Sequence, residues 1–298
     1  MHITPPAKLG LVGLGLIGSA LARRFLAAGF YVMGSDPVAR CREQLSTEGG
    51  ETALAPREIF RSCECVVLSL PNSGITLEVL AGISGKESSC RLVIDTTTSS
   101  PDDITALAGA ADTIGARYID ATISGSSTQV EAGTATVMAG ADPESFAHCR
   151  AVFAAFSRKA FHTGEAGSGT HMKLVSNLIL GLNRAALAEG LHLAQVLGIP
   201  DEVLTEVLPQ TMAHSAIMDT KLDKMLHDDF TPQARLSQHL KDVRIILNQG
   251  QGRTGQFPLS EAHAALLESA QRLGFGEADN SAIRKAYPLK PDDEPLQR

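Results

Sequence analysis

The segment GSGTHMKLVSNLILGLNRAALAEGLHLAQVLG, residues 167–198, decides how the rest of the chain folds. Glycines stand at both ends and no proline interrupts it, so it predicts one long helix. At a rise of about 1.5 Å per residue this helix would be roughly 40 Å long, about the width of a domain. Because apolar residues occur almost all round it, we expect the helix to be buried on most sides.

Three polar residues break the apolar pattern on one face of this helix. At about 100° per residue, Lys173, Asn177 and Arg184 lie within about 40° of one another, with Ser176 to one side. A lysine on a buried helix is costly unless it is solvated, paired or used in a reaction. One interpretation is an ammonium that reaches solvent while its stem covers apolar surface. The part of the chain that precedes the helix favours a reacting lysine.

The composition of the 298 residues is that of an ordinary two-domain globular protein, with 44% hydrophobic and 20% charged residues. The net charge of −7 and the lack of a lysine or arginine cluster predict neither a nucleic-acid nor a membrane partner. No apolar run approaches the roughly 20 residues that span a bilayer, and MHITPPAK lacks a signal-peptide core, so we expect a cytoplasmic protein. We expect reduced thiols and no metal site, because metal-ligand spacing is absent among Cys41, Cys63, Cys65, Cys90 and Cys149.

The segment LGLVGLGLIGSALARRFLAAGF, residues 9–30, predicts a strand, a glycine turn and an amphipathic helix. Two glycines in such a turn allow a pyrophosphate to approach closely, and the third lets the helix pack against the strand. The helix N-terminus then offers N–H groups to the phosphates. A turn with a purely structural role is the alternative. We expect the dinucleotide to contact Gly13, Leu14, Gly15, Leu16, Ile17 and Gly18.

Asp36 ends the next predicted strand, 18 residues beyond Gly18. A dinucleotide fold places an acid there against the adenosine ribose, and its charge repels a 2′-phosphate. We therefore expect NAD rather than NADP as the cofactor. Asp36-Pro37 also resembles a helix N-cap followed by proline at the first helical position, and both interpretations can hold together. Arg40, one turn later, can attract a phosphate, which leaves NADP open.

Three further apolar segments predict strands at 65–71, 91–101 and 118–121, with helices near 56–61, 75–80 and 101–115. This alternation indicates a parallel sheet covered on both faces, with ligands at the carboxyl ends of its strands. Leu70-Pro71 and Thr96–Ser99 would then lie beside the glycine turn. After the last strand, the turn from Ser124 to Ser127 carries N–H and hydroxyl groups that suit a carboxylate or an oxyanion.

The glycine-rich segment HTGEAGSG, residues 162–169, predicts the boundary between two domains. Beyond it we predict helices near 201–208, 215–227, 234–249, 259–273 and 279–286, and no strand. The fold class is therefore an α/β Rossmann-type dinucleotide-binding domain, 1–164, followed by an all-α substrate and oligomerisation domain, 165–298. The long helix joins them, and we expect the tail at 287–298 to be loosely ordered.

These motifs, taken in order, resemble the β-hydroxyacid dehydrogenase family, which includes 3-hydroxyisobutyrate dehydrogenase and tartronate semialdehyde reductase. The glycine turn resembles the family's cofactor fingerprint, with Ile17 where methionine is usual and Arg24 where asparagine is usual. The segments LSLP and DTTTSSP are similar to later cofactor segments. That resemblance implies cofactor contacts by Leu70, Pro71 and Thr98.

The segment DATISGSSTQVEAGT, residues 120–134, resembles the family's substrate segment, usually written DAPVSGG. Ser124 and Gly125 match this pattern, whereas Thr122 and Ser126 depart from it. The resemblance implies that Ser124, Gly125 and Ser126 hold the substrate carboxylate. Ser126 would alter the shape of that pocket while keeping a backbone donor.

The segment GSGTHMKLVSN resembles the family's catalytic-helix motif, which implies that Lys173 is the catalytic lysine and Asn177 its companion. HLKDVRIIL resembles the last motif, which implies that Lys241 lies by cofactor and substrate. The implied reaction is hydride transfer between a nicotinamide and a small 3-hydroxy acid or semialdehyde. Lys173 can serve as general acid/base if burial and a second cation, such as Lys241, lower its pKa. The long helical half also predicts a homodimer or homotetramer.

Three alternatives remain open. Decarboxylating 6-phosphogluconate dehydrogenases look similar around the lysine, but are longer and typically carry histidine where Ser176 stands. Imine reductases share the architecture but typically lack the lysine. A non-catalytic dinucleotide-binding protein is the third alternative, and Lys173, Asn177 and Lys241 argue against it. The substrate and the direction of the reaction stay open.

Overall fold

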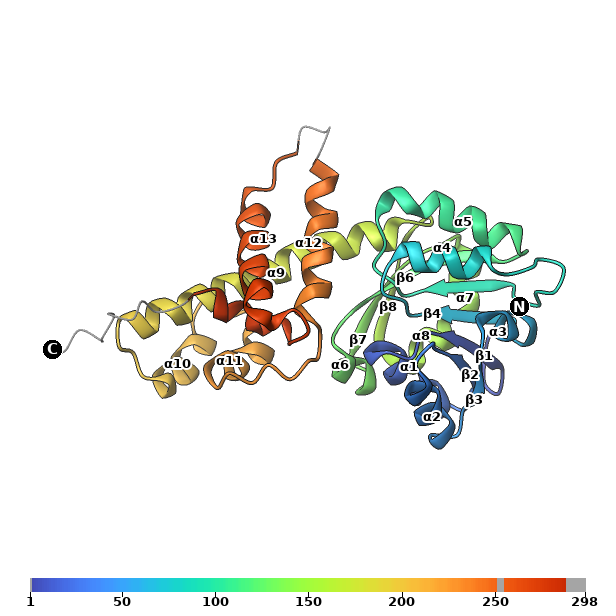
Figure 1. Ribbon diagram of the computed structural model, residues 1–298, viewed down its shortest axis with the longest axis horizontal. Coiled ribbons are helices and arrows are strands. Elements are labelled where there is room, and N and C mark those ends of the chain that lie inside the picture. Colours follow the sequence, from blue (N-terminus) through green and yellow to red (C-terminus); the bar gives the residue numbers. More distant parts are fainter. Residues whose placement is uncertain (1, 251–254, 288–298) are drawn as a thin grey trace. The chain divides into compact units, whose positions relative to one another are not determined.

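The computed structural model describes residues 2–250 and 255–287, so the predicted tail lies, apart from Tyr287, outside the described residues. The chain divides into two units, unit 1 ending at Lys173 and unit 2 beginning at Leu174. Each unit is described by itself below (Figure 1). The domain boundary predicted at 164/165 stays a prediction.

Unit 1 is built on an eight-stranded sheet with the order β3-β2-β1-β4-β5-β6-β7-β8. The first six strands in this order, from β3 through β2 and β1 to β6, run parallel to one another. Strand β7 runs antiparallel to β6, and β8 runs parallel to β7. The strands are β1 (Lys8–Val12), β2 (Tyr31–Ser35), β3 (Glu51–Ala53), β4 (Cys65–Leu68), β5 (Leu92–Asp95), β6 (Arg117–Ser124), β7 (Ala135–Gly140) and β8 (Ser157–Gly164).

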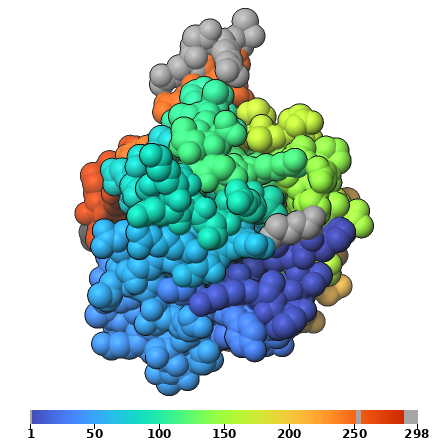
Figure 2. Space-filling view, turned by 90° about the vertical axis from the view of Figure 1, so that its right-hand side faces the viewer, coloured from blue at the N-terminus to red at the C-terminus, as the bar shows by residue number. Residues whose placement is uncertain are grey.

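Hydrophobic clusters cover both faces of this sheet. Successive residues of one strand enter opposite clusters, as Leu11 and Val12 do in β1 and Val66 and Val67 in β4. This alternation follows from the pleat of a strand. Figure 2 shows a surface of unit 1 formed by the blue N-terminal part and the cyan and green segments that include α4 and α5. The helices are α1 (Leu16–Ala27), α2 (Ala39–Thr47), α3 (Pro56–Ser62), α4 (Ser73–Ala81), η1 (Pro101–Asp103), α5 (Ile104–Thr113), α6 (Ser127–Glu131), α7 (Pro143–His148) and α8 (Arg150–Phe156).

The long helix α9 (Ser168–Val196) leads from unit 1 into unit 2. Between 174 and 287, the described residues hold no strand beyond one isolated bridge between Arg235 and Asp279. A single hydrophobic cluster joins α9 to the helices that follow, and this α/β and all-α architecture confirms the predicted fold class. These elements are α10 (Asp201–Val207), η2 (Leu208–Gln210), α11 (Met218–Leu226), α12 (Leu236–Gly250), α13 (Pro258–Ala270), η3 (Gln271–Phe275) and η4 (Asn280–Ala286).

One expectation about these elements is wrong. Helix α9 is not buried on most sides, since Val175, Ile179 and Leu193 are each more than half exposed. The strands β3, β7 and β8 were also not predicted. Strand β3 has only three residues, and β8, SRKAFHTG, is a largely exposed edge strand whose polar residues conceal it. In the part of the chain that the structure describes, no helix is long and apolar enough to span a membrane.

Candidate functional site

The three glycines of the turn after β1 have different roles. Gly13 has a φ of +94°, and a Cβ there would collide with the carbonyl oxygen of Ser69. A Cβ at Gly18 would collide with the carbonyl oxygen of Gly13. At Gly15, by contrast, a Cβ would meet no atom within 4 Å. Gly13 and Gly18 therefore let strand, turn and helix pack, whereas the backbone at Gly15 faces open space that a ligand can approach.

Helix α1 begins directly at this open position. Its N-cap is Gly15, which makes no side-chain cap hydrogen bond, and Leu16 is 43% exposed. The first-turn N–H groups of Leu16, Ile17 and Gly18 have no intrahelical acceptors, and they carry the positive end of the helix dipole. This turn can therefore accept a pyrophosphate. Leu14 is buried and its N–H donates to Asp36 Oδ2 at 2.8 Å, so that N–H is used within the protein.

Asp36 is held at the carboxyl end of β2 by two backbone donors. Its Oδ2 accepts from Leu14 and its Oδ1 accepts from the N–H of Val38, both at 2.8 Å. The N-cap of α2 is Val38, so the interpretation of Asp36 as N-cap and Pro37 as first helical residue is wrong. Arg42, which sequence reasoning missed, donates to the Asp36 carbonyl oxygen and adds a cation beside Arg40.

The predicted cofactor segments after β4 and β5 lie at the same sheet edge as the glycine turn. Strand β4 pairs with both β1 and β5, and all three run parallel. The N–H of Leu70 donates to Thr97 Oγ1 at 3.2 Å, which links the two segments. Leu70 and Thr98 are half-buried, and Pro71 is exposed. The structure therefore brings together at one edge the residues that the resemblance implied.

The start of α9 is anchored to β6 by two residues that sequence reasoning did not single out for this role. Asp120 Oδ1 accepts from the N–H of Gly167 at 2.7 Å, and Oδ2 accepts from the N–H of Thr170 at 2.6 Å. Thr122 Oγ1 donates to the Gly169 carbonyl at 3.1 Å. Burial raises the pKa of Asp120 to about 6, although both backbone donors oppose this. The sequence signal that could have identified Asp120 is a carboxylate within the apolar segment YIDATI.

The predicted carboxylate-binding turn is partly occupied by its own capping interactions. The N–H of Ser126 donates to Gln129 Oε1 at 2.9 Å, and Ser126 Oγ lies 2.7 Å from Thr128 Oγ1. Ser126 thus serves as the N-cap of α6. Gly125 has a φ of +151°, a conformation that favours glycine. A carboxylate bound at this turn would compete with Gln129 for the Ser126 N–H, or use the neighbouring groups of Ser124 and Gly125.

Within unit 2, one carboxylate joins two of the predicted site residues. Asn177 Nδ2 donates to Asp242 Oδ2 at 2.8 Å, and Lys241 Nζ lies 3.3 Å from Asp242 Oδ1. Asn177 is 4% exposed and Asp242 8% exposed. Sequence reasoning named Lys241 but missed Asp242, although an acid directly after that lysine marks the position. This contact fixes the amide of Asn177, so that its Oδ1 is left to accept from another group.

Lys173 lies one helical turn before Asn177 on α9 and is 9% exposed. So low an exposure disfavours an ammonium that simply reaches solvent. Among the residues that the structure describes, no group of three or more histidine, cysteine, aspartate or glutamate side chains could hold a metal ion.

Comparisons with known proteins match almost the whole chain. Residues 8–164 match the family model described as the NAD binding domain of 6-phosphogluconate dehydrogenase. Residues 167–287 match that described as the NAD-binding domain of NADP-dependent 3-hydroxyisobutyrate dehydrogenase. These descriptions name both NAD and NADP, and they do not distinguish between the two cofactors.

Relatives and a solved structure agree with these matches. The chain is 29% identical to 2-(hydroxymethyl)glutarate dehydrogenase of Eubacterium barkeri, across 94% of each chain. It is 28% identical to L-threonate dehydrogenase of Cupriavidus necator, across 94% of this chain and 96% of that protein. The crystal structure of 3-hydroxyisobutyrate dehydrogenase from Salmonella typhimurium superposes with a TM-score of 0.85 and 26% identity, covering 94% of this chain and 99% of the other.

Proposed function

The chain belongs to the β-hydroxyacid dehydrogenase family, and from this premise we propose that it transfers a hydride between NAD and a small 3-hydroxy acid, with Lys173 as the general acid/base. That it is an NAD(P)-dependent 3-hydroxyacid dehydrogenase follows from its relatives. The roles of single residues and the choice of NAD are our proposal. The observation that carries it is the shared contact of Asn177 and Lys241 with Asp242, since Asn177 lies one turn along α9 from Lys173.

The proposed proton transfer follows from the chemistry of the alcohol. The nicotinamide, when bound, supplies the hydride acceptor or donor. Oxidation of the alcohol carbon requires the hydroxyl proton to leave, and the neutral amine of Lys173 accepts it. In the reverse direction the ammonium of Lys173 donates that proton to the aldehyde oxygen. Because Asn177 Nδ2 is engaged by Asp242, its Oδ1 can accept from the substrate hydroxyl or the ammonium and orient either group.

The substrate carboxylate, in this proposal, is bound by the turn from Ser124 to Ser126 and by Lys241. The backbone donors of the turn favour an anion. Lys241 adds a positive charge, which Asp242 holds in place at 3.3 Å. The named substrates of two relatives, 2-(hydroxymethyl)glutarate and L-threonate, are small carboxylates with a hydroxyl group, and they define the class to test.

A substrate panel tests the function directly. Reduced-nicotinamide absorbance is followed with 3-hydroxyisobutyrate, L-threonate and 2-(hydroxymethyl)glutarate, each with NAD and with NADP. We expect turnover of at least one of these acids, and no turnover of 2-hydroxybutyrate, in which the alcohol carbon is displaced by one position. Binding of NAD without turnover of any hydroxy acid would instead support the non-catalytic alternative.

The Asp36→Asn variant tests the choice of cofactor. It keeps one acceptor oxygen for the N–H groups of Leu14 and Val38 but removes the charge that would repel a 2′-phosphate. We expect the wild type to prefer NAD, and the ratio of kcat/KM for NADP over NAD to rise about 10-fold in the variant, as a modest charge effect would produce. If the wild type prefers NADP, Asp36 does not select the cofactor and only holds the backbone at Leu14 and Val38 in place.

A further inference from the structure

Arg184 is a buried charge without a direct partner. It lies on α9, is 2% exposed, and its Nε and Nη1 are buried with no hydrogen-bond partner. Burial lowers the pKa of Arg184 to about 10, which still leaves the guanidinium charged at neutral pH. A buried cation with unmet donors is costly unless an anion compensates it. The position therefore calls for an acceptor that the described side chains do not supply.

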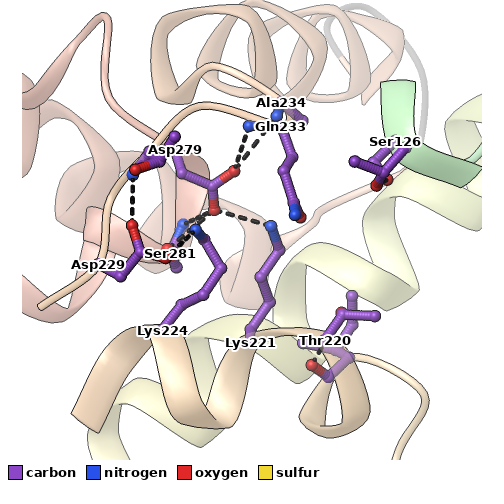
Figure 3. A network of polar contacts seen from close by, with 12 residues as sticks. Ser126, Thr220, Lys221, Lys224, Asp229, Gln233, Ala234, Asp279 and Ser281 are labelled. Atoms are coloured by element: carbon purple, nitrogen blue, oxygen red, sulfur yellow. Dashed lines mark hydrogen bonds and ion pairs between the residues drawn. The ribbon is translucent and has the colours of Figure 1, made fainter. Parts of the chain in front are cut away.

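Asp279 is the carboxylate that acts on Arg184 through its charge, but its oxygen atoms are already taken. Asp279 Oδ1 accepts from Lys221 Nζ at 2.7 Å and from the N–H and hydroxyl of Ser281. Oδ2 accepts from the N–H groups of Gln233 and Ala234. Figure 3 shows these donors converging on Asp279. Because Asp279 is already paired with Lys221, its charge offsets that of Arg184 only in part.

Arg184 shares one face of α9 with Asn177, and Gly181 lies between them. A Cβ at Gly181 would stand 2.6 Å from His263 Cε1 and 2.7 Å from His239 Nε2, so both imidazole rings lie directly against the helix backbone. The ring centroids are 5.2 Å apart, and His263 Nε2 is buried without a partner. We call Arg184, His239 and His263 the basic wall.

We propose that the basic wall binds a second acidic group of the substrate, a carboxylate at the end remote from the reacting alcohol. The inference rests on the proposed function, because Asn177 marks where the alcohol lies. Asn177 and Arg184 are seven residues apart, or about 10 Å along the helix axis. Helical side chains lean toward the N-terminus, which brings the guanidinium closer to Asn177. A few carbon atoms therefore span from the alcohol to the guanidinium.

The substrate preference of the holoenzyme tests this inference. The kcat/KM values for 2-(hydroxymethyl)succinate and 2-(hydroxymethyl)glutarate are compared with that for 3-hydroxyisobutyrate, which has no second carboxylate. We expect at least one diacid to be preferred by about 10-fold or more, the value of one charged hydrogen bond. Arg184→Met should lower that ratio by at least about 10-fold. The control Arg244→Met removes an exposed arginine of α12, paired with Glu268, and should keep the wild-type ratio.

A binding measurement separates this inference from the proposed function. Calorimetry with glutarate and butyrate needs no turnover, and we expect glutarate to bind more tightly to the wild type but not to Arg184→Met. If no hydroxy acid is oxidised while glutarate binding depends on Arg184, the proposed function is wrong but the proposed anion site is supported. If Arg184→Met does not fold, the wild-type ratio of kcat/KM for the diacids over 3-hydroxyisobutyrate decides whether the inference holds. A wild type that does not prefer diacids overturns the inference. The inference is also overturned if chloride or phosphate alone raises the melting temperature of the wild type but not that of Arg184→Met.

Discussion

At the scale of single residues, Lys173 carries the proposed chemistry. Lys173→Ala should reduce kcat by about 10²- to 10⁴-fold, the usual effect of losing a general acid/base. Lys173→Arg should not restore activity, because a guanidinium does not release its proton near neutral pH. The rate of oxidation should rise with pH through an ionisation in the wild type, and this ionisation should be absent in Lys173→Ala. NAD affinity and melting temperature, measured in parallel, should change little.

The matched control for this prediction is Lys159→Ala in strand β8, where the lysine ammonium lies over the Phe161 ring. It should retain wild-type kcat and the wild-type pH profile. If Lys173→Ala turned over within a few-fold of the wild type and kept its pH profile, another group would have to move the proton.

Because His263 is buried, we predict that the protein becomes less stable to unfolding as the pH falls. Burial, and then the charge of Arg184, lower the pKa of His263 to about 4, below its ordinary 6.5. The unfolded chain therefore binds this proton first as the pH falls. The contribution to stability is complete above pH 6.5 and is lost as the pH falls toward 4, by up to about 3 kcal/mol.

The measurement is the free energy of unfolding between pH 7 and pH 4. His263→Gln should remove this part of the acid destabilisation, so that the variant and wild-type curves approach each other at low pH. The control His2→Gln, at an exposed position, should follow the wild-type curve. Parallel curves for the wild type and His263→Gln would show that His263 does not stay neutral in the folded protein.

At the scale of elements, the sequence predicts what local pattern encodes. The apolar period and terminal glycines predict 167–198, and the structure has Ser168–Val196. The strand, turn and helix at 8–27 also follow from local residues. A local sequence pattern does not encode a hydrogen-bond partner that is distant in the sequence. Asp120 anchors a helix 47 residues later, and Asp242 contacts Asn177 across 65 residues, so both roles appear only in the folded chain.

Gly169 and Gly190 lie on the same helix and should respond to alanine in opposite ways. A Cβ at Gly169 would stand 2.5 Å from the Met138 carbonyl oxygen and 2.6 Å from that of Asp120. At Gly190 a Cβ would meet nothing within 4 Å. Gly169→Ala should therefore destabilise the protein by at least about 1 kcal/mol and lower kcat, since Lys173 follows one turn later.

Gly190→Ala should instead stabilise the protein by about 0.5–1 kcal/mol, because alanine loses less backbone entropy in a helix interior. Denaturant unfolding of both variants measures the two effects, and kcat is measured beside them. Equal effects of the two substitutions would mean that the anchor between β6 and α9 does not constrain the helix.

At the scale of the whole molecule, α9 shows why an apolar pattern does not reveal what covers it. The helix carries apolar residues on almost all sides, yet an outward line of them is exposed in the single chain. Their exposed fractions are 44% for Met172, 52% for Val175, 55% for Ile179 and 57% for Leu193. Their spacing of three, four and fourteen residues keeps them on one side of the helix. An apolar line of this kind on a protein surface indicates a protein–protein contact.

We therefore predict that the protein is a homodimer or homotetramer in which a second copy covers this side of α9. Ile179→Glu together with Leu193→Glu places two charges where apolar contact is expected, and this should shift the assembly to monomer in sedimentation at micromolar concentration. Leu54→Glu is the matched control, because Leu54 is a 79% exposed leucine outside α9 and its substitution should leave the assembly unchanged. A wild-type protein that sediments as a monomer would leave the apolar line without a partner copy.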